Sequence, residues 1–508
     1  MKAVLVARSG HPTAPKEGRR PTFLPVILAG LATEIVYFAA TVGPLSFLQH
    51  GRVLTDLGKL TSSSPTAAAI VLVSLVALFA FYGVALRRIA ASGEHATRLA
   101  LLGTAIFSLT LVFIYPATAI DIYNYAVQGH VAVFQHLNPL VTPPAQAKSD
   151  PFVQYGGTWA NSTSPYGPVW IFLTEADALV AGNNIINAVL GLKAVAAIAV
   201  VGTAGLLAWF QRSEGSRASR AVVFFGWNPL VQLELVGNGH NDAVLTLLLI
   251  AGLIAMKKDR PVLGAIGFTL SLLVKSLAVG VLPLLFIQML RMPGRTIRNR
   301  LLITIVSALT VVGMAVLAYA PFWAGSTTLD RIQAVDSNYL GSLSALAILL
   351  IPNSIHWLIY PRVAILGVVG ISLVFLVWTR RTPLERAVFE IIFVTILMAT
   401  HFAGWYLPVL VAVAALAGDG WSQARMIAFT FAATLTTPIW EYAWSWSQGR
   451  LSMEEFHLIV VPLVFVPTLG VTLLALWHMV KQRQNQLDGP QNYWGDIRHL
   501  VAQLACLQ

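Results

Sequence analysis

Charged residues are scarce in this sequence. Of its 508 residues, 11% are charged and 56% are hydrophobic, and the mean hydropathy is +0.71. Soluble globular proteins carry about 25% charged residues, so this composition leaves too few charges to cover the surface of a soluble body of this length. It therefore excludes a soluble globular protein.

Other features are missing as well. The single cysteine, Cys506, excludes an intramolecular disulfide. Ten-residue segments of alternating polarity are absent, which disfavours a membrane β-barrel. The net charge of +11 is divided among short basic clusters between apolar blocks, so it does not indicate a nucleic-acid partner.

Long apolar runs fill most of the chain instead. Blocks such as Leu99 to Ile120 and Leu301 to Phe322 are about 20 residues long, enough for a helix to cross roughly 30 Å of hydrocarbon. The sequence predicts an all-α, polytopic integral membrane bundle of about 12 to 14 transmembrane helices. The expected spans are 23–43, 66–86, 99–120, 183–210, 221–236, 242–256, 261–274, 276–290, 301–321, 362–378, 387–400, 405–417, 426–442 and 457–478.

Basic residues predict the orientation of these spans. With the N-terminus inside, most of the 33 Lys and Arg residues fall on the side of the two termini, as the positive-inside rule requires. We expect cytoplasmic tails at 1–22 and 479–508 around a transmembrane domain at 23–478, in the plasma membrane. The few basic residues on the opposite, external side are Arg52, Lys59, Lys148, Arg331 and Arg450.

The segment from Pro261 to Leu290 is apolar but strongly basic at both flanks. A single helix would carry one flank to the external side, whereas two half-helices that turn near Lys275 keep both flanks inside. Interrupted helices of this kind line polar sites in membrane proteins. We therefore expect Lys275 at the tip of a hairpin, where it either snorkels to the interface or holds a phosphate.

Polar residues gather in the external segments, chiefly the loops 121–169 and 322–361. Asp121 directly follows an apolar span. It is either a helix cap at the interface or a carboxylate at a membrane-edge cavity, where partial burial would raise its pKa and suit it to act as a general base. Asp121, Tyr125 and Gln128 share one helical face, which predicts a short amphipathic helix on the outer leaflet.

Two rigid motifs follow along the chain. The turn SPYGP (164–168) is fixed by its prolines, and its Tyr166 either stacks on a sugar or joins an interfacial aromatic belt. The motif WNPL (227–230) breaks a span, and GNGHND (237–242) follows at the external end of that span.

The last three residues of GNGHND have two interpretations. Asn241 or Asp242 could simply cap the next helix, or both could join His240 in a polar site. His240 and Asp242 alone are too few ligands for a metal.

Further candidates lie in later external segments. Arg331 in the second long loop is either a ligand-binding cation or an ordinary surface arginine. His401, Trp405 and Tyr406 cluster at the external end of another expected span.

These ordered segments resemble the GT-C superfamily of glycosyltransferases, membrane enzymes that use polyprenyl-phosphate-linked sugars. The resemblance spans roughly residues 100–410 and is strongest toward the polyprenol-phosphomannose-dependent α-1,6-mannosyltransferases of actinobacterial lipoglycan synthesis. The catalytic acid of that family usually follows the first core span, whereas Asp121 follows the third expected span, so two extra N-terminal spans are needed to align them. The matching segments are DIYNY (121–125), SPYGP (164–168), WNPL (227–230), GNGHND (237–242), the stretch around Lys275 and WYLP (405–408).

The resemblance implies a glycosyltransferase that moves a hexose, expected to be mannose, from a polyprenyl-phosphate donor to a glycan or glycolipid acceptor on the extracytoplasmic face. Asp121 would accept the proton of the attacking hydroxyl, and the anomeric centre would be inverted. No second acid stands beside Asp121, which argues against a metal-dependent variant. No cofactor is expected, and a divalent metal is left open although no residue pattern indicates one. The residues expected to bind substrate are Tyr123, Tyr125, Tyr166, His240, Asn241, Asp242, Lys275, Arg331, His401, Trp405 and Tyr406.

Other functions would explain part of the same pattern. A transporter or flippase of a lipid-linked sugar would also have broken helices and intramembrane acids, but its site would lie near the midplane of the membrane. A cell-surface glycan polymerase or ligase would share both the external site and the lipid-linked donor. A membrane scaffold would not need polar residues gathered at one face.

Overall fold

The described part of the chain is helical throughout. The computed structural model describes residues 23–89, 94–214, 216–330, 339–351 and 353–487, and within these ranges the only β-type pairings are isolated bridges. Each expected apolar span overlaps at least one helix, so the all-α class is confirmed. The predicted tail 1–22 and Arg331 lie outside the described residues; of the predicted tail 479–508, the described part continues the last helix to Leu487.

Within the described residues, six helices are long and apolar enough to cross a membrane, or seven if a bent pair is one span. The chain is therefore a multi-pass membrane protein. The six are Leu24–Val42 (α1 Leu24–Val36 with the π-helix η1 Tyr37–Val42), α4 Pro65–Ile89, α8 Ile185–Phe210, Ile297–Phe322 (α13 Ile297–Tyr319 with η8 Ala320–Phe322), α16 Ile359–Trp378 and Glu454–Lys481 of α20 (Met453–Leu487). The bent pair is the π-helix η6 (Val231–Gly237) and α10 (Asp242–Lys257), which meet at 116°.

Full-length spans are thus fewer than the 12 to 14 expected, because several apolar segments are short or interrupted. Asn228 and Pro229 follow the end of α9, and Lys275 separates α11 from α12. The π-helix and α10 together make one bent span at most. Six of the remaining helices of the bundle have 18 residues or fewer: α5 Glu94–Leu111, α9 Ser216–Gly226, α11 Pro261–Val274, α12 Val281–Leu290, α17 Leu384–Leu397 and α18 Leu407–Ala417. The last, α19 Gly420–Ser447, has 28 residues and a proline inside it, Pro438.

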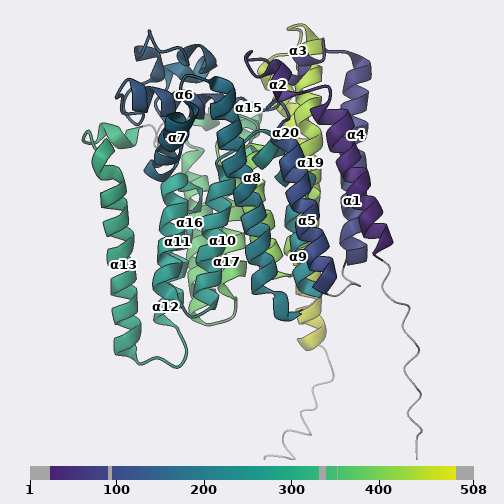
Figure 1. The fold of residues 1–508 in the computed structure, drawn as a ribbon. Helices are drawn as coiled ribbons and strands as arrows, with labels where there is room; N and C mark the ends of the chain where they lie inside the picture. Colours follow the sequence, from purple (N-terminus) through teal and green to yellow (C-terminus); the bar gives the residue numbers. More distant parts are fainter. Residues whose placement is uncertain (1–22, 90–93, 215, 331–338, 352, 488–508) are drawn as a thin grey trace, which may run out of the picture.

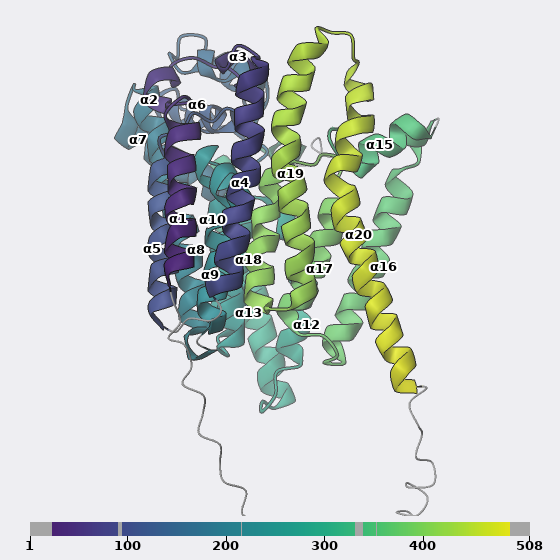
Figure 2. The ribbon, with the colours of Figure 1, turned by 90° about the vertical axis from the view of Figure 1, so that its right-hand side faces the viewer.

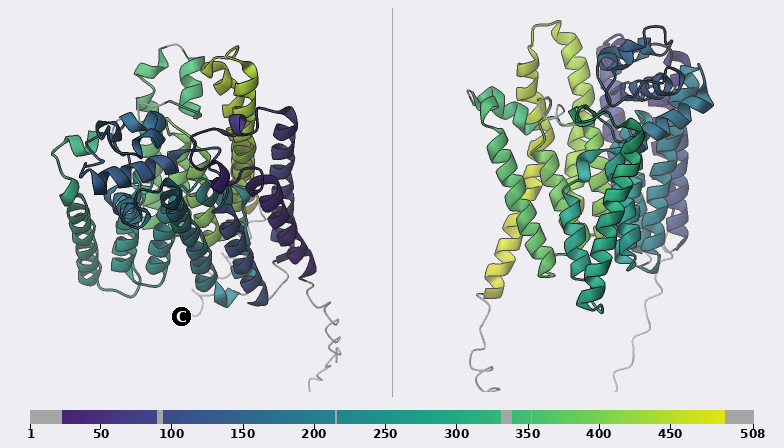
Figure 3. Two further views of the ribbon diagram at one scale, coloured as in Figure 1. Left: turned by 45° about the horizontal axis from the view of Figure 1, so that its top comes forward. Right: turned by 90° about the vertical axis from the view of Figure 1, so that its left-hand side faces the viewer.

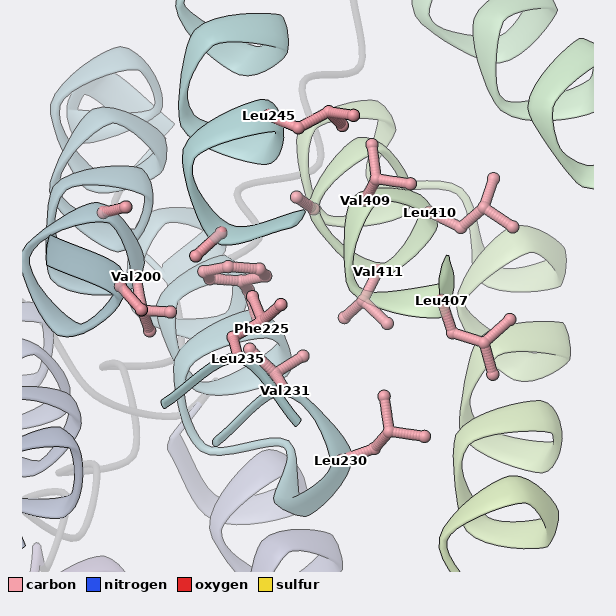
Figure 4. Close-up of a cluster of buried hydrophobic side chains, with 14 of the residues drawn as sticks. Val200, Phe225, Leu230, Val231, Leu235, Leu245, Leu407, Val409, Leu410 and Val411 are labelled. Atoms are coloured by element: carbon pink, nitrogen blue, oxygen red, sulfur yellow. The ribbon is translucent and has the colours of Figure 1, made fainter. Parts of the chain in front are cut away.

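The core of the bundle surrounds α18. This helix is apolar on every side, and each residue from Leu407 to Leu416 is buried, as expected for a helix enclosed by other helices. Figure 4 shows its Val409 and Val411 facing Leu245 of α10 and Val231 of η6. The bent pair is thereby held against the centre of the bundle. In contrast, α13 stands at the edge of the bundle (Figure 1), with only 6% of its apolar window buried.

Short helices cap one end of the bundle (Figures 1 and 3). The longest are α6 (Asp121–Phe134) and α7 (Pro168–Ala181), which pack side by side. The others at this end are α2 Phe47–His50, α3 Leu57–Leu60 and the 3-10 helices η2 Pro144–Gln146, η3 Val153–Tyr155 and η4 Gly157–Asn161. The remaining short helices of the described chain connect longer ones: η5 Arg212–Glu214, η7 Ser276–Ala278, η9 Thr327–Leu329, α15 Leu343–Leu350, η11 Ser354–His356 and η12 Gly404–Tyr406.

The helix predicted at Asp121 begins at that residue, but it does not lie with one face on the lipid. Every residue from Ile122 to Val131 is buried, polar and apolar faces alike. The periodicity predicted the helix correctly, whereas the covering of both faces comes from α7, α8 and the 3-10 helices of the same loop. The expectation of an amphipathic helix on the outer leaflet is therefore wrong for α6.

The start of α1, the end of α20 and the basic flanks of the α11–α12 segment lie at the opposite end of the bundle. Figure 2 shows α1 beginning and α20 ending at the lower end of the molecule. The guanidinium of Arg295, after α12, donates to Asp259, before α11, at 2.6 Å. Both flanks of the α11–α12 segment thus meet, which confirms the predicted pair of half-helices with Lys275 between them.

Candidate active site

Asp121 is the first residue of α6 and lies at the capped end of the bundle. The N-cap position belongs to Ile120, whose side chain makes no cap hydrogen bond, so Asp121 does not serve as the helix cap. Its half-buried carboxylate stands at the positive end of the helix dipole, which favours negative charge.

A pair of tyrosines stands beside the carboxylate of Asp121, and one of them hydrogen-bonds it. The hydroxyl of Tyr166, in the SPYGP turn, hydrogen-bonds this carboxylate. The hydroxyl of Tyr125, one turn along α6, donates to Tyr166 at 3.2 Å, and the two rings meet edge to face. Burial raises the pKa of Tyr166 well above its usual value, so the phenol stays a neutral hydrogen-bond donor.

Lys275 supplies a positive charge to the same site. Because α11 ends at Val274, the backbone of Lys275 is extended and its side chain leaves the helix axis. Its Nζ lies 2.8 Å from Oδ2 of Asp242 and 4.6 Å from the ring centroid of Tyr406. The same Nζ also lies 5.9 Å from the ring centroid of Tyr166. An ammonium has three donors, so the ion pair with Asp242 leaves capacity for a ligand oxygen.

The sharp turn between η6 and α10 carries buried polar atoms without hydrogen-bond partners. They are both ring nitrogens of His240, both amide atoms of Asn241 and Oδ1 of Asp242. The amide of Asn241 does not cap α10, although it occupies the N-cap position, so the capping interpretation fails there. Unpaired buried polar groups are costly and require an explanation, and a polar ligand in this space would provide one.

Aromatic and imidazole rings lie beside these polar groups. The ring of His240 stacks on Trp405 with centroids 4.1 Å apart, and His401 meets Tyr406 edge to face. Burial lowers the pKa of His401 to about 4, and the charge of Lys275 adds to this shift. His401 is therefore neutral at physiological pH.

The electrostatic environment favours a proton acceptor at Asp121. Burial by the surrounding protein raises the pKa of Asp121 from 3.8 to about 6, an effect opposed by Lys275 and reinforced by Asp242. A general base works best when its pKa lies near the working pH. Within the described residues, no group of three or more His, Cys, Asp or Glu side chains could hold a metal ion.

The structure therefore brings most of the predicted residues together and leaves one of the described residues, Tyr123, apart. Tyr123 points into a different set of contacts, where its hydroxyl donates to the carbonyl of Gly51 and its ring stacks on Tyr155. Arg331 lies outside the described residues.

Glu234 and Asn238 of the π-helix segment were missed as site residues. The amide of Asn238 donates to Glu234 at 2.8 Å and to Thr118 at 2.7 Å. Oε2 of Glu234 lies 3.7 Å from Nε2 of His240. An acid inside an apolar run was the available signal, but it does not reveal which side of the helix the acid faces.

Comparison with known proteins gives one family. The family described as "Alpha-(1->6)-mannopyranosyltransferase, N-terminal domain" matches residues 27–294, more than half of the chain. The matched region begins within α1, so α1 and α4 are part of the family's own region and are not additions to it.

Individual relatives agree with that match. The chain is similar to alpha-(1->6)-mannopyranosyltransferase A of Mycobacterium tuberculosis, at 26% identity over 441 residues, or 82% of this chain and 78% of that protein. It is also similar to the Corynebacterium glutamicum proteins of the same name, form A at 23% identity (39% of this chain, 40% of the relative) and form B at 30% (26% and 22%). No solved structure shows a significant match.

Proposed function

The chain belongs to the alpha-(1->6)-mannopyranosyltransferase family, and from that premise we propose that it transfers mannose from a polyprenyl-phosphate donor to a hydroxyl of a glycan or glycolipid. Family membership identifies the chain as a mannosyltransferase. The enzyme hypothesis is therefore preferred to that of a transporter of a lipid-linked sugar. The donor, the acceptor, the mechanism and the side of the membrane are the parts proposed.

One observation carries the mechanism. The carboxylate of Asp121 is half-buried, is held by Tyr166 and has its pKa raised to about 6. In this state it is mostly ionised at neutral pH yet basic enough to accept a proton as the acceptor oxygen attacks the anomeric carbon. General-base assistance of this kind contributes about 10²- to 10⁴-fold.

The groups around Lys275 suit the leaving phosphate. As the sugar departs, the lipid phosphate gains negative charge, and a preorganised ammonium in a partly enclosed site stabilises it. Lys275 is fixed by Asp242 and by the ring of Tyr406, and its side chain is only 15% exposed. The phosphate and the base would then stand on opposite sides of the anomeric carbon, which leads to inversion.

The position of the site supports an extracytoplasmic reaction. The basic clusters near Arg87, Arg260, Arg295 and Arg380 end or flank helices at the end of the bundle away from α6. By the positive-inside rule that end faces the cytoplasm. Asp121 would consequently face the other side, together with the polar loop 121–169.

The donor class can be tested in membranes that carry the protein. With labelled polyprenyl-phosphate mannose, we expect label in lipid-extractable glycans through an α-1,6 bond. With labelled nucleotide-linked mannose, and synthesis of the lipid-linked donor blocked, we expect none. Incorporation from the nucleotide-linked sugar under that block would contradict the proposed donor.

A further inference from the structure

A cavity lies beside the site, among the membrane-spanning helices. Its volume is about 80 Å³, several times the roughly 10–15 Å³ that one water requires. Three walls come from η1, from α4 and from α19. Figure 2 shows these helices side by side on one face of the molecule. We call this cavity the α4–α19 groove.

The walls of the groove are apolar. Its side chains include Leu45, Leu57, Val71, Leu75 and Pro438, with small hydroxyl residues between them. The hydroxyl of Thr434 is already used by the backbone carbonyl of Thr430. The hydrocarbon chain of an amphiphile taken up from water would therefore gain burial there without displacing bound polar groups, at about 25 cal/mol for each Å² removed from water.

The end of the groove nearest the active site is polar and acidic. Glu234, Asn238 and Thr118 line it, and the amide of Asn238 links the other two side chains. Among the described residues that line the groove, none is Lys, Arg or His. A phosphate at this end would meet the carboxylate of Glu234 with no compensating cation, whereas a hydroxyl group could donate to that carboxylate.

This polar end joins the groove to the reacting groups. Thr118 stands three residues before Asp121, and Glu234 lies close enough to Asp121 and Asp242 to interact electrostatically with both. Lys275, which fits the phosphate of the donor, pairs instead with Asp242. Asp121 thus has a cationic neighbour, Lys275, and a carboxylate–amide neighbour pair, Glu234 and Asn238, and of these only the pair also lines the apolar groove.

We infer that the α4–α19 groove binds the hydrocarbon chain of a lipid-linked acceptor, with the uncharged hydroxyl-bearing head held by Glu234 and Asn238 beside Asp121. This inference rests on the proposed function and specifies its acceptor as an amphiphile. The donor chain would leave the site on the side of Lys275.

The test compares two acceptor probes, decyl mannoside and methyl mannoside, with polyprenyl-phosphate mannose as donor. The variants Ser74→Phe and Thr437→Phe fill the groove from opposite walls, since both residues line it and neither is fully buried. In each, KM for decyl mannoside should rise about tenfold, the loss expected when about two methylene groups are no longer buried. Transfer to methyl mannoside and KM for the donor should stay unchanged.

Val73→Phe is the matched control, because Val73 lies on the same helix but is 68% exposed toward the lipid. It should leave all three constants unchanged, and the use of two walls covers the case in which one variant fails to fold. A raised KM for the donor, equal losses with both acceptors, or no preference of the unaltered protein for the decyl chain would overturn the groove assignment. Absence of transfer to either probe by the unaltered protein would instead count against the proposed function.

Discussion

At the scale of the residue, the charge on Asp121 depends on its neighbours. Burial raises the pKa of the carboxyl group, while Lys275 and the hydrogen bond from Tyr166 lower it. The outcome, a pKa of about 6, is high enough for proton acceptance and low enough for ionisation at neutral pH. Each of these neighbours comes from a different segment of the chain.

A pH profile tests this balance. Because the base must be ionised, kcat/KM should rise with pH up to about 6 and then level, with a loss of about tenfold for each pH unit below the midpoint. In Lys275→Gln the midpoint should move to higher pH, since the positive charge that lowers the pKa of Asp121 is removed. A profile flat from pH 5 to pH 8 (roughly the range of one base titration) would contradict the assigned pKa.

At this scale the sequence predicts which residues belong to the site better than it predicts the contacts that those residues make. Asp121 after a long apolar run indicated a helix start and a carboxylate at the membrane edge, and the helix begins there. The sequence could not give its hydrogen bond with Tyr166 or the role of Glu234, because both depend on how distant segments pack. Tyr123 shows the same limit, since its motif neighbours reach the site while its own hydroxyl turns to Gly51.

At the scale of the element, broken helices place the functional groups. The break at Lys275 was predictable because basic flanks at both ends of one apolar segment cannot be satisfied by a single span. The break at WNPL was signalled by its proline. The 116° bend between η6 and α10 was not predictable, because the burial of the turn by α18 and η12 determines it.

Gly167 offers a test of how these elements fit together. Its amide donates to the carbonyl of Val274 at 3.0 Å, and an added Cβ would stand 2.2 Å from the carbonyl oxygen of Leu273. Gly167→Ala must therefore push the SPYGP turn, with Tyr166, away from the end of α11. We expect kcat/KM to fall by about a hundredfold, as for a small misplacement of reacting groups.

The matched control for that change is Gly205→Ala in α8, where a Cβ meets no atom within 4 Å. It should leave the rate unchanged. Equal rates in the two variants would show that the contact between the turn and α11 does not position the site.

At the scale of the whole molecule, the bundle gathers the site at one end and its basic flanks at the other. The sequence predicted the membrane class, because a chain with 11% charged residues has no soluble alternative. It overestimated the full-length spans because enclosed helices such as α18 are short as well as apolar. Likewise, the periodicity of α6 could not reveal that both its faces are covered.

The proposed mechanism depends on Asp121 as the proton acceptor of mannosyl transfer. The direct measurement is the rate at which purified, folded Asp121→Asn transfers label from polyprenyl-phosphate mannose, beside Asp330→Asn, which alters an exposed aspartate in the same way. We expect a loss of at least about 10²-fold in Asp121→Asn, with donor binding retained, and an unchanged rate in Asp330→Asn. Transfer by Asp121→Asn at the rate of the unaltered protein would rule out Asp121 as the proton acceptor.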